Sequence, residues 1–172
     1  MNLQWGWMAR KDLEVVLDNE RDTEDPMTRA ALNKKLREPD AAAFVVVDAD
    51  YQVLVGHVIL TKTGSALRVN RMTVMPEVFR EAVVFCAAQL KALAKRWHQN
   101  VIEFVVSEDD FPMMYALNKA GFISEKKHTG YFDDPTQAGY VMRYRFGKKP
   151  STKTEPSTGR ITATGKTIWH FQ

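Results

Sequence analysis

The feature that most constrains this fold is the segment of residues 72–85, where a strand-prone run passes into a long helix with no glycine between them. Pro76 stands where a helix is expected to begin, because proline is tolerated in the first helical turn. Apolar residues then recur at helical spacing, which predicts an amphipathic helix over residues 77–98. Its expected buried stripe consists of Phe79, Ala82, Val83, Cys86, Leu90, Leu93, Ala94 and Trp97. A strand that leads directly into such a helix is typical of an α/β fold.

The rest of the chain predicts a sheet covered by helices. A short strand over residues 3–8 precedes two helices, residues 11–20 and 26–37, and Asp25 is the expected N-cap of the second. A further helix is expected over residues 110–121. The expected later strands are residues 44–48, 53–60, 66–74, 101–106, 122–129 and 140–146. We therefore expect an α/β fold in which helices flank a mixed, mostly antiparallel sheet.

The composition changes after Phe146, where Gly, Pro, Ser, Thr and Lys become frequent. Such a composition is typical of a linker. We therefore expect one domain over residues 1–146 and a basic tail over residues 147–172 that ends in an apolar segment. Residues 148–172 contain five Lys or Arg and one Glu, a charge of +4, while the whole chain carries +3. The domain is thus near neutral, and nucleic-acid binding is not expected except through the tail.

The sequence does not indicate a membrane protein, a secreted protein, a metalloprotein or a reactive cysteine. Its apolar runs are too short for a membrane span and its first residues lack a signal-peptide pattern, so a cytoplasmic protein is expected. The four histidines show no ligand spacing, and no metal site is predicted. The single cysteine, Cys86, lies in an Ala-rich helical run, which indicates a buried and unreactive thiol.

Residues 72–85, followed by Asn118-Lys119-Ala120-Gly121-Phe122, resemble the GNAT superfamily of acetyl-CoA-dependent N-acetyltransferases. The nearest branch is that of the ribosomal-protein-alanine N-acetyltransferases, which residues 7–17 and the hairpin of residues 130–144 resemble. The resemblance covers about residues 3–146. It implies a GNAT-like fold, acetyl-CoA as cofactor and N-acetyltransferase activity.

The resemblance also implies where the cofactor would lie, although the glycines of the family's pyrophosphate loop are missing. An Arg/Gln-x-x-Gly-x-Gly/Ala loop brings backbone N–H groups against the phosphates, and side chains hinder this approach. Aligning Pro76 with the family's proline puts Arg80, Ala82 and Val84 at the loop positions, whereas anchoring on Arg80 puts Val83 and Phe85 there. The candidate cofactor-binding residues are Met72, Thr73, Val74, Phe79, Arg80, Ala82, Val84 and Asp110.

The catalytic positions that the resemblance implies are also altered. The family's strand glutamate falls on Val105, and the tyrosine that serves the branch as general acid falls on Leu117. Glu103 lies two residues before Val105 on the same expected sheet face and is a candidate base through a water molecule. A solvated charge at a strand end is the alternative for Glu103. Tyr131 is the candidate proton donor, with an ordinary rim tyrosine as the alternative.

Two functions of different classes follow. In the first, the chain is a non-catalytic interaction or structural subunit that keeps the acetyltransferase fold without its motifs. In the second, it is an acetyl-CoA-dependent N-acetyltransferase acting on a protein or peptide amine. The tail fits the first, because Ile168, Trp169 and Phe171 form a strand-prone segment that could add to the sheet edge of a partner protein. The alternative is a disordered tail, and a homo-oligomer through the free edge strands stays open.

Overall fold

The computed structural model describes residues 1–23, 25–129 and 138–147. Within these residues, the chain forms one seven-stranded sheet in the order β1-β2-β3-β4-β5-β7-β6. The strands are β1 (Leu3–Trp7), β2 (Ala41–Asp48), β3 (Val53–Thr63), β4 (Ala66–Val74), β5 (Val101–Ser107), β6 (Ile123–Thr129) and β7 (Ala138–Arg145). Neighbouring strands are antiparallel, except that β4 and β5 are parallel. The mixed, mostly antiparallel sheet predicted from the sequence is confirmed.

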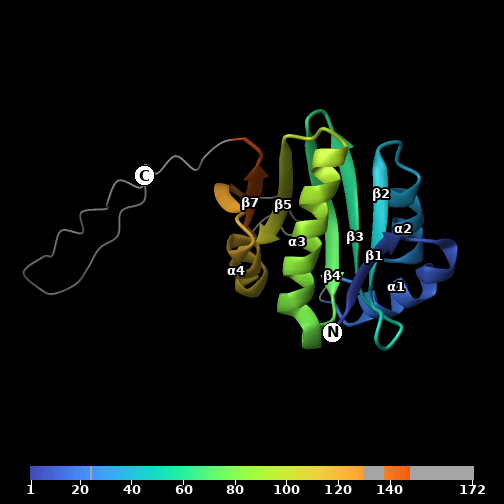
Figure 1. Cartoon of the computed structure of the whole chain (residues 1–172). Coiled ribbons are helices and arrows are strands. Elements are labelled where there is room, and N and C mark those ends of the chain that lie inside the picture. The colour runs from blue at the N-terminus through green and yellow to red at the C-terminus, as the bar shows by residue number, and fades with distance from the viewer. Residues whose placement is uncertain (24, 130–137, 148–172) are drawn as a thin grey trace, which may run out of the picture.

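Helices cover both faces of the sheet. They are α1 (Leu13–Arg21), α2 (Arg29–Leu36), α3 (Phe79–Arg96) and α4 (Phe111–Lys119), and short 3₁₀ turns at Arg10–Asp12 and Pro76–Val78 precede α1 and α3. Figure 1 shows α3 and α4 on one face and α1 and α2 on the other. In the described part of the chain, no helix is both long and apolar enough to cross a membrane.

Each face of the sheet has its own apolar core. The larger core lies under α3 and α4, and the smaller one, built around Val16, Leu32 and Ile59, lies under α1 and α2. The predicted stripe of α3 is confirmed, because its central residues are buried while Phe79 and Trp97 at its two ends are only partly buried. The central buried residues of α3 are Ala82, Val83, Cys86, Ala87, Leu90, Leu93 and Ala94.

The second helix begins later than the sequence predicted. Thr28, not Asp25, is the N-cap of α2, and its hydroxyl accepts a hydrogen bond from the Ala31 N–H at 3.2 Å. The Asp25 side chain is 95% exposed and lies 3.8 Å from Arg71 instead. A second good capping residue three positions downstream therefore displaced the expected start.

Other boundaries also differ from the expected ones. β2 begins at Ala41 and β3 continues to Thr63, because the pairing of residues 41–43 with residues 59–61 extends the hairpin beyond the β-branched core. Alanine has a weak strand preference, so this extension has little signal in the sequence. α3 ends at Arg96 rather than near residue 98, since His98 takes a left-handed conformation with φ of 54°.

The ends of α4 agree with the prediction. Asp110 is its N-cap, with Oδ1 accepting a hydrogen bond from the Met113 N–H at 3.0 Å. At the other end, Gly121 has φ of 87°, the left-handed conformation that commonly terminates helices at glycine. The cap at Asp110 accounts for this residue without any ligand.

We expect Asp110→Ala to lower the free energy of unfolding by about 1 kcal/mol, because the N-terminal amide of α4 would lose its acceptor. Chemical denaturation monitored by circular dichroism would measure the change. Asp109→Ala is the control, since Asp109 is exposed and does not cap the helix. Equal stability losses in the two variants would contradict the assigned cap.

Candidate functional site

The sheet opens between its two parallel strands. β4 and β5 pair only over residues 66–69 and 101–104. Beyond this point, β4 continues along β3 to Val74, while β5 continues along β7 to Ser107. Among the described residues, the edge of β4 that faces β5 therefore has no strand partner from residue 70 onward. We call the space between residues 70–74 and residues 105–107 the wedge.

A β-bulge lies where the wedge begins. In the β3–β4 register, Ile59 faces Arg71 and Leu60 faces Val69, so Asn70 is the extra residue of β4. A bulge bends and twists its strand. This bend lets β4 leave β5 while it remains paired with β3. The wedge is consequently built into the backbone and does not depend on a particular side chain.

Two helices begin at the wide end of the wedge. The turn at Pro76–Val78 and then α3 follow β4, and α4 follows β5, so parallel strands bring both helix N-termini to the same side. Val78, the N-cap of α3, makes no side-chain capping hydrogen bond. Ligands of open α/β sheets bind outside the carboxyl ends of strands, and helix N-termini favour anions.

The structure places four of the eight predicted cofactor-binding residues at this wedge. Met72, Thr73 and Val74 form its β4 wall, and Asp110 lies at its wide end. The other four residues, Phe79, Arg80, Ala82 and Val84, all lie within α3. The chain thus passes from β4 into α3 through one 3₁₀ turn rather than through a glycine loop. Arg80 is exposed and available to an anion, whereas Ala82 is buried in the core.

A buried polar cluster lies on the sheet face that α1 and α2 cover, beside β4. The Glu20 carboxylate is fully buried at the end of α1 and accepts hydrogen bonds from Arg71 Nε at 3.2 Å and Thr73 Oγ1 at 2.6 Å. Buried His57 places Nε2 3.0 Å from Glu20 Oε1, and the Met27 N–H donates to Oε2 at 3.0 Å. One carboxylate therefore joins α1 and the segment before α2 to strands β3 and β4.

Burial by itself would raise the pKa of Glu20, because it disfavours the charged form. The contacts with His57, Arg71 and Thr73 and the Met27 N–H outweigh this effect and lower the pKa well below its ordinary value. Glu20 is thus a carboxylate at neutral pH.

Glu20 was not among the residues predicted to form a site, although the sequence carries a signal for its burial. It continues the helical stripe of Leu13, Val16 and Leu17. Charged residues are almost never fully buried unless they are paired, so a glutamate on such a stripe indicates a buried ion pair.

Glu103 lies at the narrow end of the wedge and is not a solvated strand-end charge. Its side chain is 10% exposed, in the middle of β5. Arg68 Nε donates to Oε1 at 3.1 Å, and Arg143 Nε donates to Oε2 at 2.8 Å. Arg143 also binds Glu125, which pairs with Arg145. Guanidinium groups therefore bind both oxygens of Glu103. Its role as a base stays a prediction.

The positions where the family's catalytic side chains would fall carry apolar groups in the structure. Leu117 is fully buried in the larger core, and Val105 is partly buried on β5. Tyr131, the predicted proton donor, lies outside the described residues, as do Ile168, Trp169 and Phe171 of the tail. Burial raises the pKa of the Cys86 thiol to about 12, in agreement with the expected unreactive cysteine.

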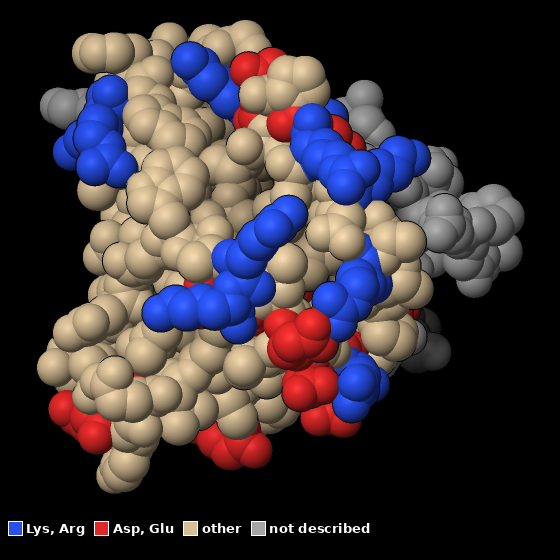
Figure 2. Space-filling model, turned by 90° about the vertical axis from the view of Figure 1, so that its right-hand side faces the viewer, with Lys and Arg blue, Asp and Glu red and all other residues tan. Residues whose placement is uncertain are grey.

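Charges of both signs are mixed on the side of the molecule where α1 and α2 lie. On the face in Figure 2, Lys and Arg side chains form separate groups with Asp and Glu among them. This arrangement does not form one continuous basic surface on that face. Among the described residues, no group of three or more His, Cys, Asp or Glu is placed to hold a metal ion.

No family model and no curated protein sequence matches this chain. Solved structures do match. Ard1 from Thermoplasma volcanium has a TM-score of 0.73 and 19% identity, covering 84% of this chain and 98% of its own. The ribosomal-protein-S18-alanine N-acetyltransferase from Escherichia coli has a TM-score of 0.71 and 10% identity, covering 87% and 97%. Spermidine N-acetyltransferase from Vibrio cholerae, solved with CoA and spermine, has a TM-score of 0.66 and 19% identity, covering 84% and 95%.

These matches extend over nearly the whole length of the solved acetyltransferase chains, but at identities that show the fold alone. They agree with the mixed sheet flanked by helices. The chain has the fold of the GNAT N-acetyltransferases.

Proposed function

We propose that this chain is an acetyl-CoA-dependent N-acetyltransferase that acts on a protein or peptide amine. The observation that carries the proposal is the wedge, where the edge of residues 70–74 that faces β5 has no strand partner among the described residues. An extended ligand with amide groups, such as the pantetheine arm of CoA, can hydrogen-bond to such an edge as an added strand would. The fold shared with solved N-acetyltransferases supports the same function.

The residues present fit the parts of the cofactor to different degrees. The backbone of Thr73 and its neighbours in β4 would hold the pantetheine arm. The uncapped N-terminus of α3 and the exposed Arg80 would face the pyrophosphate, because both favour a phosphate anion. Glu77 and Glu81 lie in the same turns and oppose this attraction. The binding of the phosphates is therefore expected to depend strongly on Arg80.

When bound, the cofactor supplies an activated acetyl group. The chain's own contribution would be mainly to position the acceptor amine, since proximity alone accounts for much of the acceleration in a transfer between two bound molecules. Glu103 could accept the amine proton through a water molecule at the narrow end of the wedge. In that role, Arg68 and Arg143 would hold its carboxylate in place.

Isothermal titration of acetyl-CoA into the full chain tests the proposal, and we expect a micromolar Kd. Arg80→Ala should weaken this Kd about 10- to 100-fold, because it removes one charge-assisted hydrogen bond. Arg96→Ala is the matched control, since Arg96 is exposed at the opposite end of the same helix. No heat at millimolar acetyl-CoA would overturn the proposal.

A non-catalytic subunit is the second candidate, favoured by the apolar Val105 and Leu117 at the expected catalytic positions. The two candidates differ in turnover. Release of CoA in the presence of acceptor peptides, followed with a thiol reagent, would support the enzyme. Micromolar binding of acetyl-CoA without any transfer to a broad set of amines would favour the subunit.

A further inference from the structure

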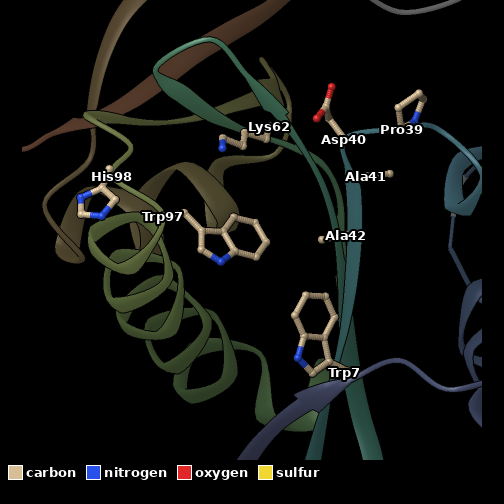
Figure 3. A pocket seen from close by; sticks show the side chains of 8 residues that line it. All are labelled: Trp7, Pro39, Asp40, Ala41, Ala42, Lys62, Trp97 and His98. Atoms are coloured by element: carbon tan, nitrogen blue, oxygen red, sulfur yellow. The ribbon is translucent and has the colours of Figure 1, made fainter.

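A pocket of about 440 Å³ lies at the end of the molecule opposite the wide end of the wedge, where α3 ends. Two tryptophans dominate it. Trp7 comes from the edge strand β1, and Trp97 is the C-cap of α3. Figure 3 shows both indole rings at the cavity, with Lys62 of β3 above Trp97 and His98 beside Trp97 at the end of α3. The remaining lining residues are Pro39, Asp40, Ala41 and Ala42.

The tryptophans leave aromatic surface uncovered. One side of Trp7 packs on Phe44, with ring centroids 4.4 Å apart, yet the residue is 60% exposed. The Trp97 ring lies 6.3 Å from that of Trp7 at an angle of 31°. A large exposed ring beside a second, partly exposed ring at a cavity is typical of a site that receives an apolar or aromatic group. The charged rim of Asp40 and Lys62 disfavours a lipid-like occupant.

The described chain ends beside this pocket. The Phe146 N–H donates to the Asn100 carbonyl at 3.0 Å, directly after β7. Asn100 is two residues from His98 of the pocket, so their Cα atoms are within about 8 Å of each other. Phe146, the next-to-last described residue, therefore lies close to the pocket rim.

The sequence beyond this point supplies a suitable occupant. Residues 148–166 are rich in Gly, Ser, Thr, Pro and Lys, and a linker of such composition and length has a root-mean-square span of about 22–26 Å. This span exceeds the distance of at most about 8 Å between the Cα atoms of Asn100, which Phe146 contacts, and His98 at the pocket rim. Residues 167–172 then contain Trp169 and Phe171, whose spacing would put them on one side of an extended segment.

We propose that residues 167–172 of this chain dock in the pocket between Trp7 and Trp97, with an aromatic side chain of the segment placed against the two indole rings. The tether makes the segment's effective concentration about millimolar, so even a weak contact is well populated. In this arrangement, the tail folds back onto the domain of its own chain. The proposal is independent of the proposed acetyl transfer, because the wedge and the pocket lie at opposite ends of α3.

Chemical cross-linking in the full chain tests this docking. Lys62→Cys combined with His170→Cys places one thiol at the pocket and one in the segment, while native Cys86 is buried and unreactive. With a short bis-maleimide, we expect intramolecular cross-links to form about tenfold faster than in a control pair. The control combines Tyr51→Cys with His170→Cys, since Tyr51 is 76% exposed in the turn at the opposite end of β2.

Adding Trp169→Ala to the Lys62→Cys and His170→Cys pair should lower its cross-linking rate to that of the control pair. This variant keeps the docking test independent of folding, because Trp169 lies beyond the last core strand. Intact mass spectrometry separates the products. Equal rates in the two pairs, no effect of Trp169→Ala, or cross-links found only between two chains would each overturn the proposal. The last result would assign the pocket to the tail of a second copy.

Discussion

Glu20→Gln should lower the free energy of unfolding by about 3–5 kcal/mol, the usual cost of breaking one partner of a buried ion pair. The carboxylate is fully buried, and its removal would leave Arg71 without its main partner. His57, itself fully buried, would also lose the charge that it faces. Glutamine keeps nearly the same volume, so the loss measures the charge and not the packing. Chemical denaturation at pH 7 is the measurement.

The same helix supplies a control. Glu14 of α1 pairs with Arg29, but both side chains are more than half exposed, so Glu14→Gln is expected to have little effect. A loss from Glu20→Gln no greater than that from Glu14→Gln would contradict the role assigned to the cluster.

The difference between wild type and Glu20→Gln should also depend on pH. The folded-state pKa of Glu20 lies below the ordinary value of 4.5, so its stabilisation is complete above that value. It is lost as pH falls below 4.5 toward the folded-state pKa, because protons then bind the unfolded chain preferentially. The stability difference should therefore shrink between about pH 5 and pH 3. A constant difference over this range would contradict the lowered pKa.

Gly56→Ala should lower the free energy of unfolding by about 1–3 kcal/mol and weaken acetyl-CoA binding. A Cβ at Gly56 of β3 would lie 2.8 Å from the Thr73 carbonyl oxygen and 2.8 Å from Val74 Cγ1. The carbonyl belongs to the backbone of β4, which cannot move aside as a flexible side chain can. Strand β4 would shift at the wall of the wedge, and titration with acetyl-CoA should detect the shift along with the denaturation midpoint.

Gly6→Ala is the matched control for this substitution. Gly6 also lies in a strand, β1, but a Cβ there would have no atom within 4 Å. We expect nearly unchanged stability and unchanged acetyl-CoA binding. If Gly56→Ala behaved like Gly6→Ala, the close approach of Gly56 to Thr73 and Val74 would not constrain the position of β4.

Local patterns in the sequence predicted most of the elements. The apolar stripe of α3, the cap at Asp110 and the terminating Gly121 each depend on residues within a few positions of one another, and all three are confirmed. The predicted start of α2 was wrong because Asp25 and Thr28 are both competent caps. The local sequence does not show which of two such residues caps the helix. In the structure, Asp25 lies near Arg71 and Thr28 is the cap.

The amino-acid sequence by itself determined the order of strands and helices, because periodicity and backbone preference are local properties. It also shows directly that no glycine lies between β4 and α3. Only the tertiary structure decided that Glu20, His57 and Arg71 share one buried site, and that Glu103 lies between two arginines. These contacts join residues 35 or more positions apart. Their formation depends on strand register, which the bulge at Asn70 sets and which no local pattern encodes.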